Sequence, residues 1–179
     1  MSKSLGLFAA STLALGFLCT GTALAERNED REERNFMLAL DLDYSSAIDA
    51  NTVDNGGGGA LRIGSELDLI LVSLIPELSL DYHDFSSDGD VSTVTGKLGG
   101  RIRFLKIVEP GIFAHAGVGR IGGDLPHTGF AFDAGVTLDL TILPLIDLGL
   151  HAAWNRVFGG DDHPGLSYAT FGAHVALVL

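Results

Sequence analysis

The chain has little cysteine, little positive charge and no second long apolar run, and each shortage argues against a class of protein. Its single cysteine, Cys19, lies in the first apolar stretch, so no disulfide framework can hold the rest of the chain together. Lysine and arginine number 11 against 23 aspartates and glutamates, and the formal net charge is −12. This balance argues against nucleic-acid binding and against a basic membrane-surface anchor. The most apolar later run, residues 69–75, is far shorter than the roughly 20 residues of a membrane-spanning helix.

The first 25 residues have the composition of a secretory signal peptide. An early lysine precedes the short apolar run at residues 5–18, and Ala23-Leu24-Ala25 is an A-x-A cleavage signature. The bulky leucine before Cys19 argues against lipoprotein processing. The next segment, ERNEDREER, is dense in charges of both signs and lacks an apolar period, which predicts a tail. The predicted organisation is a signal peptide at 1–25, a charged N-terminal tail at 26–34 and one domain at 35–179.

Beyond the charged tail, apolar residues recur at every second position. The clearest case is residues 127–142, HTGFAFDAGVTLDLTI, where Phe130 and Val136 share one phase and Asp133 and Asp139 share the other. Such alternation predicts a strand with one apolar face and one polar face. The pattern predicts eight strands, at residues 35–44, 60–71, 76–85, 91–105, 111–120, 127–142, 146–157 and 167–179.

The predicted connections are of two kinds. The stretches SSAIDANTVDNGGGG, SSDGD, IGGDLPH and FGGDDHPGL have polar loop compositions. The joins around residues 72–75, 106–108 and 143–145 are short and are predicted to be tight turns. Because the two kinds alternate along the chain, longer loops are expected at one rim of the sheet and short turns at the other.

The polar faces of these strands are expected to point inward and the apolar faces outward. In the opposite arrangement, that of a soluble lipocalin-like carrier, many large apolar side chains would crowd an eight-stranded interior that barely admits side chains or one small ligand. The polar face is also rich in glycine and alanine, which suits a cramped lumen. Apolar-out, polar-in alternation over about ten residues is typical of outer-membrane barrels. The predicted fold is therefore all-β, an eight-stranded antiparallel up-and-down transmembrane β-barrel, with the carrier as an alternative.

Aromatic residues of the outward phase occur at two predicted levels. Near the long-loop rim these are Tyr44, Tyr82, Phe130, Phe132 and Trp154, and near the short-turn rim they are Phe36 and Phe104. This placement by level is typical of interfacial aromatic girdles, although strands favour aromatic residues in general. Arg120 and Arg156 share the outward phase, but they fall at loop ends, where a charge costs little.

With these features, residues 35–179 resemble the small eight-stranded outer-membrane proteins of Gram-negative bacteria, the OmpA/OmpX-like β-barrel class. The segment VEPGIFAHAGVG is similar to the fifth strand of that class. The C-terminal FGAHVALVL is similar to its assembly signal, although Leu179 stands where the class usually has an aromatic residue. The resemblance implies an outer-membrane location, with both termini in the periplasm and lipid around the barrel. It also implies assembly by the barrel-assembly machinery through the C-terminal strand.

Charged residues of the inward phase form the largest candidate site. They comprise Arg62, Glu66, Asp68, Glu77, Asp81, Lys97, Arg101, Arg103, Asp133, Asp139 and Asp147, with Asp41 and Asp43 in the same phase. Because the bases of the fourth predicted strand adjoin acids of the third, cross-strand ion pairs are expected. A salt-bridged plug is the favoured interpretation, since eight strands leave little room for water. The excess of acids keeps open a narrow cation-preferring channel.

Enzyme activity is not expected. The inward-phase histidines are His83, His115, His151 and His174, and the chain has neither an HExxH nor a CxxC motif. Some outer-membrane barrels are lipid A deacylases that use histidine and serine, but here no serine stands two positions after His151.

No cofactor or metal is expected either. The loop acids Asp88, Asp90, Asp161 and Asp162 lack the full spacing of a calcium loop, so they are interpreted as solvated turn residues. The expected role is structural or adhesive, with an extracellular partner that the sequence does not define.

Overall fold

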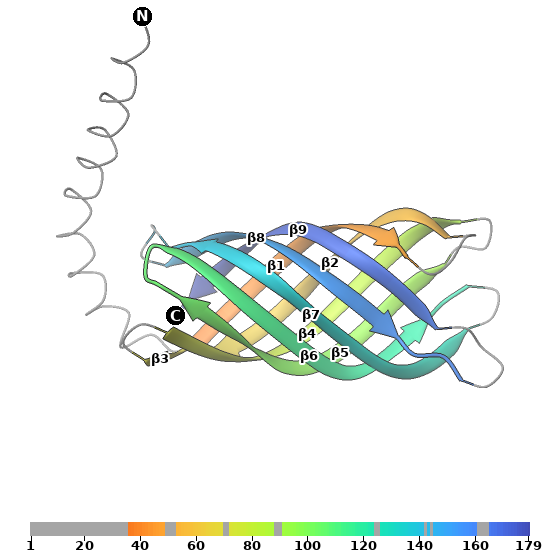
Figure 1. Ribbon diagram of the computed structural model, residues 1–179, viewed down its shortest axis with the longest axis horizontal. Coiled ribbons are helices and arrows are strands. Elements are labelled where there is room, and N and C mark those ends of the chain that lie inside the picture. Colours follow the sequence, from red (N-terminus) through yellow and green to blue (C-terminus); the bar gives the residue numbers. More distant parts are fainter. Residues whose placement is uncertain are drawn as a thin grey trace, which may run out of the picture. The chain divides into compact units, whose positions relative to one another are not determined.

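The computed structural model describes residues 36–48, 53–69, 72–87, 91–123, 126–141, 143, 145–160 and 165–179. The predicted signal peptide and charged tail, and the four loop aspartates considered for calcium, lie outside these residues and stay predictions. Residues 35–179 form one compact unit, in which the described regular structure is β-strand (Figure 1). No helix in the part of the chain that the structure describes is long and apolar enough to cross a membrane.

The strand segments run antiparallel to their neighbours and wrap into a barrel (Figure 1). Their bounds are β1 Phe36–Ala47, β2 Val53–Ser65, β3 Leu67–Leu69, β4 Val72–Ser87, β5 Ser92–Phe104, β6 Val108–Ile121, β7 His127–Leu140, β8 Ile146–Val157 and β9 Leu166–Val178. β2 and β3 pair with β4 in one register, since Gly64 lies opposite Glu77 and Leu67 lies opposite Leu74. They are two parts of one strand interrupted at Glu66, so the described residues form an eight-stranded barrel.

The barrel closes between its first and last strands. Met37 of β1 lies opposite Val178 of β9, and Ala47 lies opposite Tyr168, so the seam follows the whole length of β1. Closure leaves no sheet edge with unpaired backbone groups, which is the condition for a sheet to stand in hydrocarbon. The predicted eight-stranded antiparallel up-and-down barrel is confirmed.

The start of β2 differs from the prediction. β2 begins at Val53 rather than at residue 60, so the glycine run at residues 56–59, predicted to lie in a loop, is strand. Gly57 pairs with Tyr44 of β1 on one side and with Asp84 of β4 on the other. The glycine composition misleads here because strands on both sides supply hydrogen bonds that a local sequence signal does not contain.

Several other strand ends also extend beyond their predicted limits. β4 begins at Val72 and β6 at Val108, so parts of the predicted tight turns at residues 72–75 and 106–108 belong to strands. At the opposite rim, β4 runs through the two serines of the predicted loop SSDGD. β8 has the predicted bounds, Ile146–Val157. Pairing with a neighbour thus continues past the point where the apolar alternation fades.

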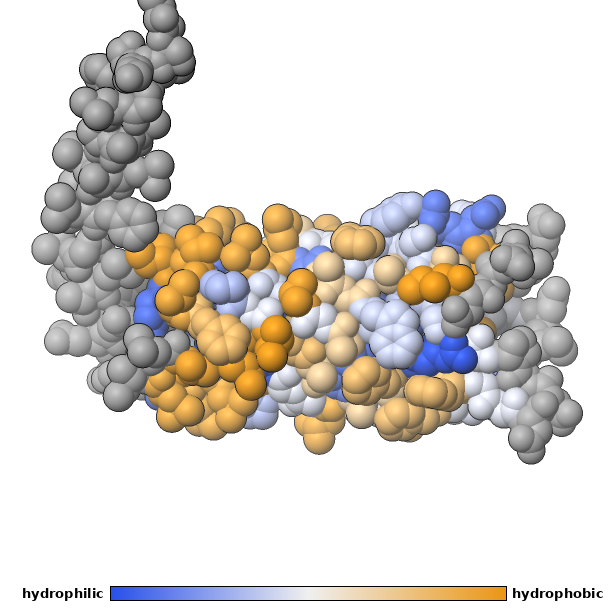
Figure 2. All heavy atoms as spheres, in the orientation of Figure 1, coloured by the Kyte–Doolittle hydropathy of each residue, from blue (hydrophilic) through white to orange (hydrophobic). Residues whose placement is uncertain are grey.

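The barrel is polar inside and apolar outside. Among the described residues, buried polar and charged side chains outnumber buried apolar ones. On β7, Phe130 and Val136 are 54% and 56% exposed, whereas Asp133 and Asp139 are 4% and 1% exposed. Figure 2 shows apolar side chains over much of the wall and hydrophilic ones gathered toward the right-hand, loop end. The alternative of a lipocalin-like carrier, with apolar faces inward, is therefore wrong.

Candidate functional site

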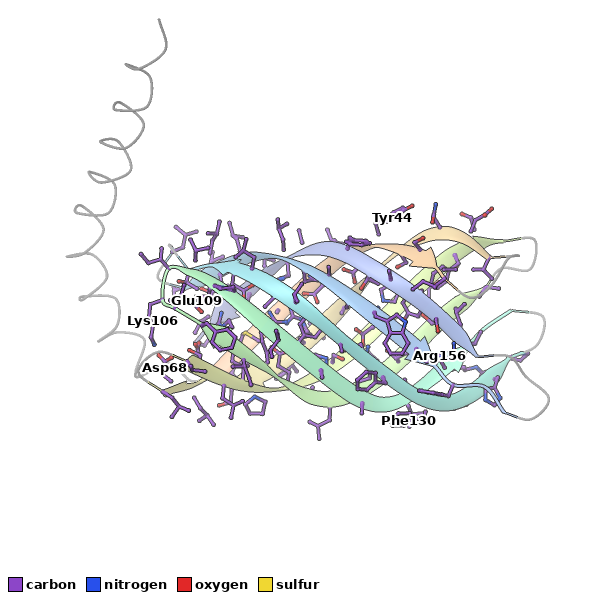
Figure 3. All side chains as sticks on the ribbon, viewed as in Figure 1. Tyr44, Asp68, Lys106, Glu109, Phe130 and Arg156 are labelled. Atoms are coloured by element: carbon purple, nitrogen blue, oxygen red, sulfur yellow. The ribbon has the colours of Figure 1, made fainter. Side chains whose placement is uncertain are left out.

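Figure 3 draws the side chains of the strands, and the buried ones line the lumen between its two rims. Near the turn rim, an apolar cluster consists of Met37, Ala39, Ile75 and Ala176. Near the loop rim, a second cluster, here called the loop-side cap, consists of Phe85, Leu166 and Tyr168, and the edge of the Phe85 ring meets the Tyr168 ring at a centroid distance of 5.2 Å. Charged and polar side chains occupy the space between the two clusters.

Arg103 of β5 is the hub of the charged side chains on the turn side. It is 1% exposed. Its Nη2 lies 2.8 Å from Glu66 Oε1, its Nε 3.1 Å from Glu109 Oε2, and its Nη1 3.1 Å from Asp147 Oδ2 and 3.7 Å from Asp139 Oδ2. A planar guanidinium with five N–H donors is suited to several carboxylates at once. One cation thus joins acids from four segments of the wall.

Glu77 of β4 receives arginines from the strands on both of its sides. Arg62 of β2 donates from Nε and Nη2 to both carboxylate oxygens of Asp41, at 2.8 and 2.7 Å, and its Nη1 lies 3.4 Å from Glu77. Arg101 of β5 approaches Glu77 with Nε at 3.1 Å and lies over the ring of Phe113, 5.3 Å from its centroid. These are the cross-strand ion pairs that neighbouring charged strands favour.

Closer to the loops, Lys97 and His115 share Asp133. The Lys97 ammonium contacts Asp133 and lies 3.3 Å from Asp81. His115 Nδ1 lies 2.8 Å from Asp133 Oδ1, and its Nε2 lies 3.2 Å from Glu77 Oε2. An imidazole donates from both nitrogens only when it is protonated. His115 therefore has the geometry of a further cation of the lumen.

The other inward histidines also make hydrogen bonds within the lumen. His151 Nε2 lies 2.6 Å from Asp43 and His174 Nε2 lies 2.7 Å from Asp139, while the two Nδ1 atoms face each other at 3.4 Å. Within the described residues, no group of three or more histidine, cysteine, aspartate or glutamate side chains is arranged to hold a metal ion.

Two acids differ from the sequence expectation. Asp68, expected in the lumen, lies at the turn rim, where Lys106 Nζ donates to it at 2.8 Å and both side chains are about a quarter exposed (Figure 3). Glu109, which contacts Arg103, lies next to a predicted turn and is absent from the predicted site. The phase it shares with Phe113 and His115 was the signal that could have identified it.

The enclosed acids exceed the enclosed lysine and arginine residues. The acids are Asp41, Asp43, Glu66, Glu77, Asp81, Glu109, Asp133, Asp139 and Asp147, and the bases are Arg62, Lys97, Arg101 and Arg103. Among them lies a cavity of about 30 Å³, lined in part by Asp41, Arg101 and His115. A space of this size has room for only a few water molecules. The buried charges of the described lumen are thus mostly acidic.

The predicted girdle residues lie on the outer wall. Tyr44, Tyr82, Phe130, Trp154, Phe36 and Phe104 are exposed, and Phe132 is half-buried. The rings of Phe132 and Trp154 are neighbours, with centroids 6.1 Å apart. Figure 3 shows Tyr44 and Phe130 projecting from opposite sides of the loop half of the barrel. Rings at this position are available to a lipid interface.

No protein-family model matches the chain, and no curated protein matches it. Solved structures do match. The crystal structure of Neisserial surface protein A has a TM-score of 0.58 and 14% identity, covering 80% of this chain and 97% of that one. The structure of Ail, the attachment invasion locus protein of Yersinia pestis, in complex with the heparin analogue sucrose octasulfate, has a TM-score of 0.54 and 16% identity, covering 82% of this chain and 99% of that one.

At this identity the likeness shows the fold alone. The fold is that of the small outer-membrane β-barrels, as the sequence predicts. Together with the apolar outer wall, it supports the predicted location in the outer membrane.

Proposed function

We propose that the chain is an integral outer-membrane barrel with a closed lumen and a structural or adhesive role exercised at its loop rim. The observation that carries this proposal is the contact of Arg103 with four acids across the lumen. A conducting pore needs a continuous water path, and the small volume of the cavity among the charged side chains, about 30 Å³, supports a closed lumen.

A catalytic role is not proposed. Ser45 Oγ lies 2.9 Å from His83 Nδ1, which is the spacing of a nucleophile and its base, but both residues are buried below the loop-side cap. The ring of His83 also packs against Tyr168 of that cap, at a centroid distance of 5.2 Å. A substrate would have to displace the cap to reach the serine, so the pair is assigned to packing and hydrogen bonding.

The surface role draws on the two similar structures, whose names describe a surface protein and an attachment protein. The ligand in the Ail structure is a heparin analogue. A polyanion of that kind is disfavoured here, because the chain carries a formal net charge of −12. The proposal therefore includes attachment but assigns it a different ligand chemistry.

The C-terminal strand is proposed to engage the barrel-assembly machinery. In β9, Phe171, Val175 and Leu177 point outward and are exposed. The outer face of this strand is therefore apolar, and the machinery could contact it during insertion. Leu179→Phe would restore the aromatic terminus usual in the class that the sequence resembles. Faster insertion of this variant into membranes that contain the machinery, with no change in its absence, is the expected result.

Three measurements test the proposed function. The protein should fractionate with outer membranes, and its folded form should migrate differently on a denaturing gel before and after boiling. In a planar lipid bilayer it should give no discrete conductance steps. Steady conductance from folded protein would contradict the closed lumen, and recovery in the soluble periplasmic fraction would contradict the membrane location.

A narrow cation-preferring channel is the second candidate, favoured by the excess of enclosed acids over lysine and arginine. Under that alternative, Asp133→Asn or Asp139→Asn would change the ion preference of a measured current. If the protein carries no current, neither substitution has a current to change, and the closed lumen is supported.

A further inference from the structure

A groove of about 630 Å³ lies on the outer surface at the loop ends of β1, β2 and β4. Its lining includes Tyr44, Asn55, Gly57, Asp84 and Ser86. It lies outside the lumen, because Tyr44, Gly57 and Asp84 are exposed members of the outward phase. The charge network of the lumen and the closed-barrel proposal make no use of it.

The floor of the groove is a glycine between two functional side chains. Tyr44 pairs with Gly57 across the β1–β2 ladder, and Gly57 pairs with Asp84 across the β2–β4 ladder. Neighbouring strands are about 4.8 Å apart, so the Tyr44 and Asp84 backbones are separated by about 10 Å. Because Gly57 has no side chain, this gap between a phenol and a carboxylate is open down to the backbone.

The fold does not require glycine at this position. A Cβ added to Gly57 would meet the Asp43 carbonyl oxygen at 3.6 Å, an ordinary contact, and nothing else within 4 Å. At the next residue the situation is different, since a Cβ on Gly58 would collide with the His83 ring and the Tyr82 carbonyl. Glycine inside a strand weakens it, and such a glycine marks a bulge, a tight bend or a place where a ligand or another backbone comes close. The irregularity of the β2–β4 ladder lies between Val53 and Gly56, so it does not include Gly57.

The groove has the chemistry of a cation site. Its one charged lining residue is Asp84 among the described residues, and Tyr44 supplies an exposed aromatic face. Asn55 and Ser86 add neutral groups that can accept hydrogen bonds. An aromatic face attracts a cation, and a carboxylate accepts hydrogen bonds from it.

The charged residues at the loop ends of the described strands are divided in the same sense. The exposed acids Asp54 and Asp84 lie on β2 and β4, whereas Arg120 and Arg156 lie on β6 and β8. In the closed strand order these two pairs are on opposite sides of the barrel. Among these described residues, the acids therefore lie near the groove and the arginines lie away from it.

We propose that this groove binds a cationic side chain of a basic peptide segment, with the guanidinium or ammonium group between Tyr44 and Asp84. The planar guanidinium of arginine fits both walls, because it stacks on an aromatic ring and pairs with both oxygens of a carboxylate. The inference extends the proposed surface role by naming the chemistry of one partner, and it rests on that role.

The test uses the full barrel in uncharged detergent micelles and a fluorescein-labelled tetra-arginine peptide, with binding followed by fluorescence anisotropy. Asp84→Asn and Gly57→Leu should each weaken binding about tenfold, since one removes the charged acceptor and the other fills the gap. Tyr44→Leu should weaken it about threefold. A labelled tetra-glutamate peptide should not bind.

Two control variants match these changes. Asp54→Asn removes an exposed rim acid that does not line the groove, and Gly96→Leu adds a side chain to another glycine with open space around it. Both should change the affinity less than about twofold. Equal weakening by Asp54→Asn and Asp84→Asn would reduce the effect to diffuse charge and overturn the site, as would unchanged binding in Gly57→Leu.

The absence of tetra-arginine binding also overturns the site, whether or not Mg²⁺ binds there. A barrel that inserts in bilayers, blocks current and ignores the peptide would refute the groove and leave the proposed closed barrel intact. A barrel that conducts yet binds the peptide would refute the proposed closed barrel and leave the groove intact.

Discussion

Nη1 of Arg103 on β5 donates a hydrogen bond to Oδ2 of Asp147 on β8 at 3.1 Å, although β6 and β7 separate the two strands along the wall. The bond therefore crosses the lumen instead of following the sheet. Both side chains are 1% exposed. Charges this deeply enclosed are screened little by solvent, so loss of Arg103 would leave its acids buried without their shared cation.

Arg103→Met should destabilise the barrel by about 3–5 kcal/mol, because it leaves Glu66, Glu109 and Asp147 enclosed without their shared cation. The measurement is reversible urea unfolding in lipid vesicles. Lys106→Met is the matched control, since its pair with Asp68 is partly exposed at the rim and should cost at most about 1 kcal/mol. Equal losses of unfolding free energy in the two variants would show that the enclosed ion pairs of Arg103 stabilise the barrel no more than an exposed pair does.

The double variant Arg101→Ser/Arg103→Ser should conduct cations. Removing two guanidinium groups opens space and leaves Glu77, Asp139 and Asp147 with less positive charge nearby. Single-channel recording under a potassium chloride gradient should give a reversal potential on the cation-selective side. Gel mobility before and after boiling establishes that the recorded protein is folded, and a folded variant without current would contradict the view that these arginines close the lumen.

An arginine on the outer wall should lower the free energy of unfolding strongly at mid-barrel and only slightly at the loop rim. Leu98 is 66% exposed on β5, and Leu98→Arg should cost about 2–4 kcal/mol if lipid surrounds it. Thr128→Arg, placed beside Arg120 at the loop end of β7, should cost about 0–1 kcal/mol. Unfolding free energies in bilayers give the comparison, and similar small costs at both sites would contradict a lipid-exposed wall.

Much of the charged lumen site can be predicted from the alternation of apolar and polar residues alone. Lys97 and Asp81 share the inward phase of adjacent strands, so their contact was predictable from two alternating segments. The bond between Arg103 and Asp147 was not, because side-chain reach across a lumen depends on strand number and stagger, which local pattern does not encode.

The differences between the predicted and observed strand limits have similar physical causes. The fifth predicted strand begins at residue 111, which leaves Glu109 outside the predicted site, whereas β6 begins at Val108. The glycine run of β2 reads as loop by composition, and its strand conformation comes from neighbours on both sides. Phase thus predicts which way a side chain points, while strand ends and cross-lumen partners need the closed barrel.

Gly149 tests how tightly the lumen is packed. A Cβ at this position would fall on Asp139 Oδ1 and on the His174 ring, which are bonded to each other at 2.7 Å. Gly149→Ala should therefore cost about 1–3 kcal/mol by separating that pair. Gly96→Ala is the control on the outer wall, with nothing within 4 Å of its added Cβ, and it should be neutral or stabilising by up to about 1 kcal/mol.

The loop-side cap should contribute as an apolar core does. Phe85 is 2% exposed and packs edge-on against Tyr168, so Phe85→Ala removes a buried ring and leaves a cavity. A loss of about 3–5 kcal/mol in urea unfolding is expected, against less than about 1 kcal/mol for Ile48→Ala, which truncates an exposed side chain near the same rim. The cap covers the buried Ser45–His83 pair. In the Phe85→Ala barrel, the imidazole N–H proton of His83 should therefore exchange faster with water, as measured by NMR of the labelled ring. A Phe85→Ala barrel as stable as Ile48→Ala, with unchanged exchange at His83, would mean that other groups close this end of the lumen.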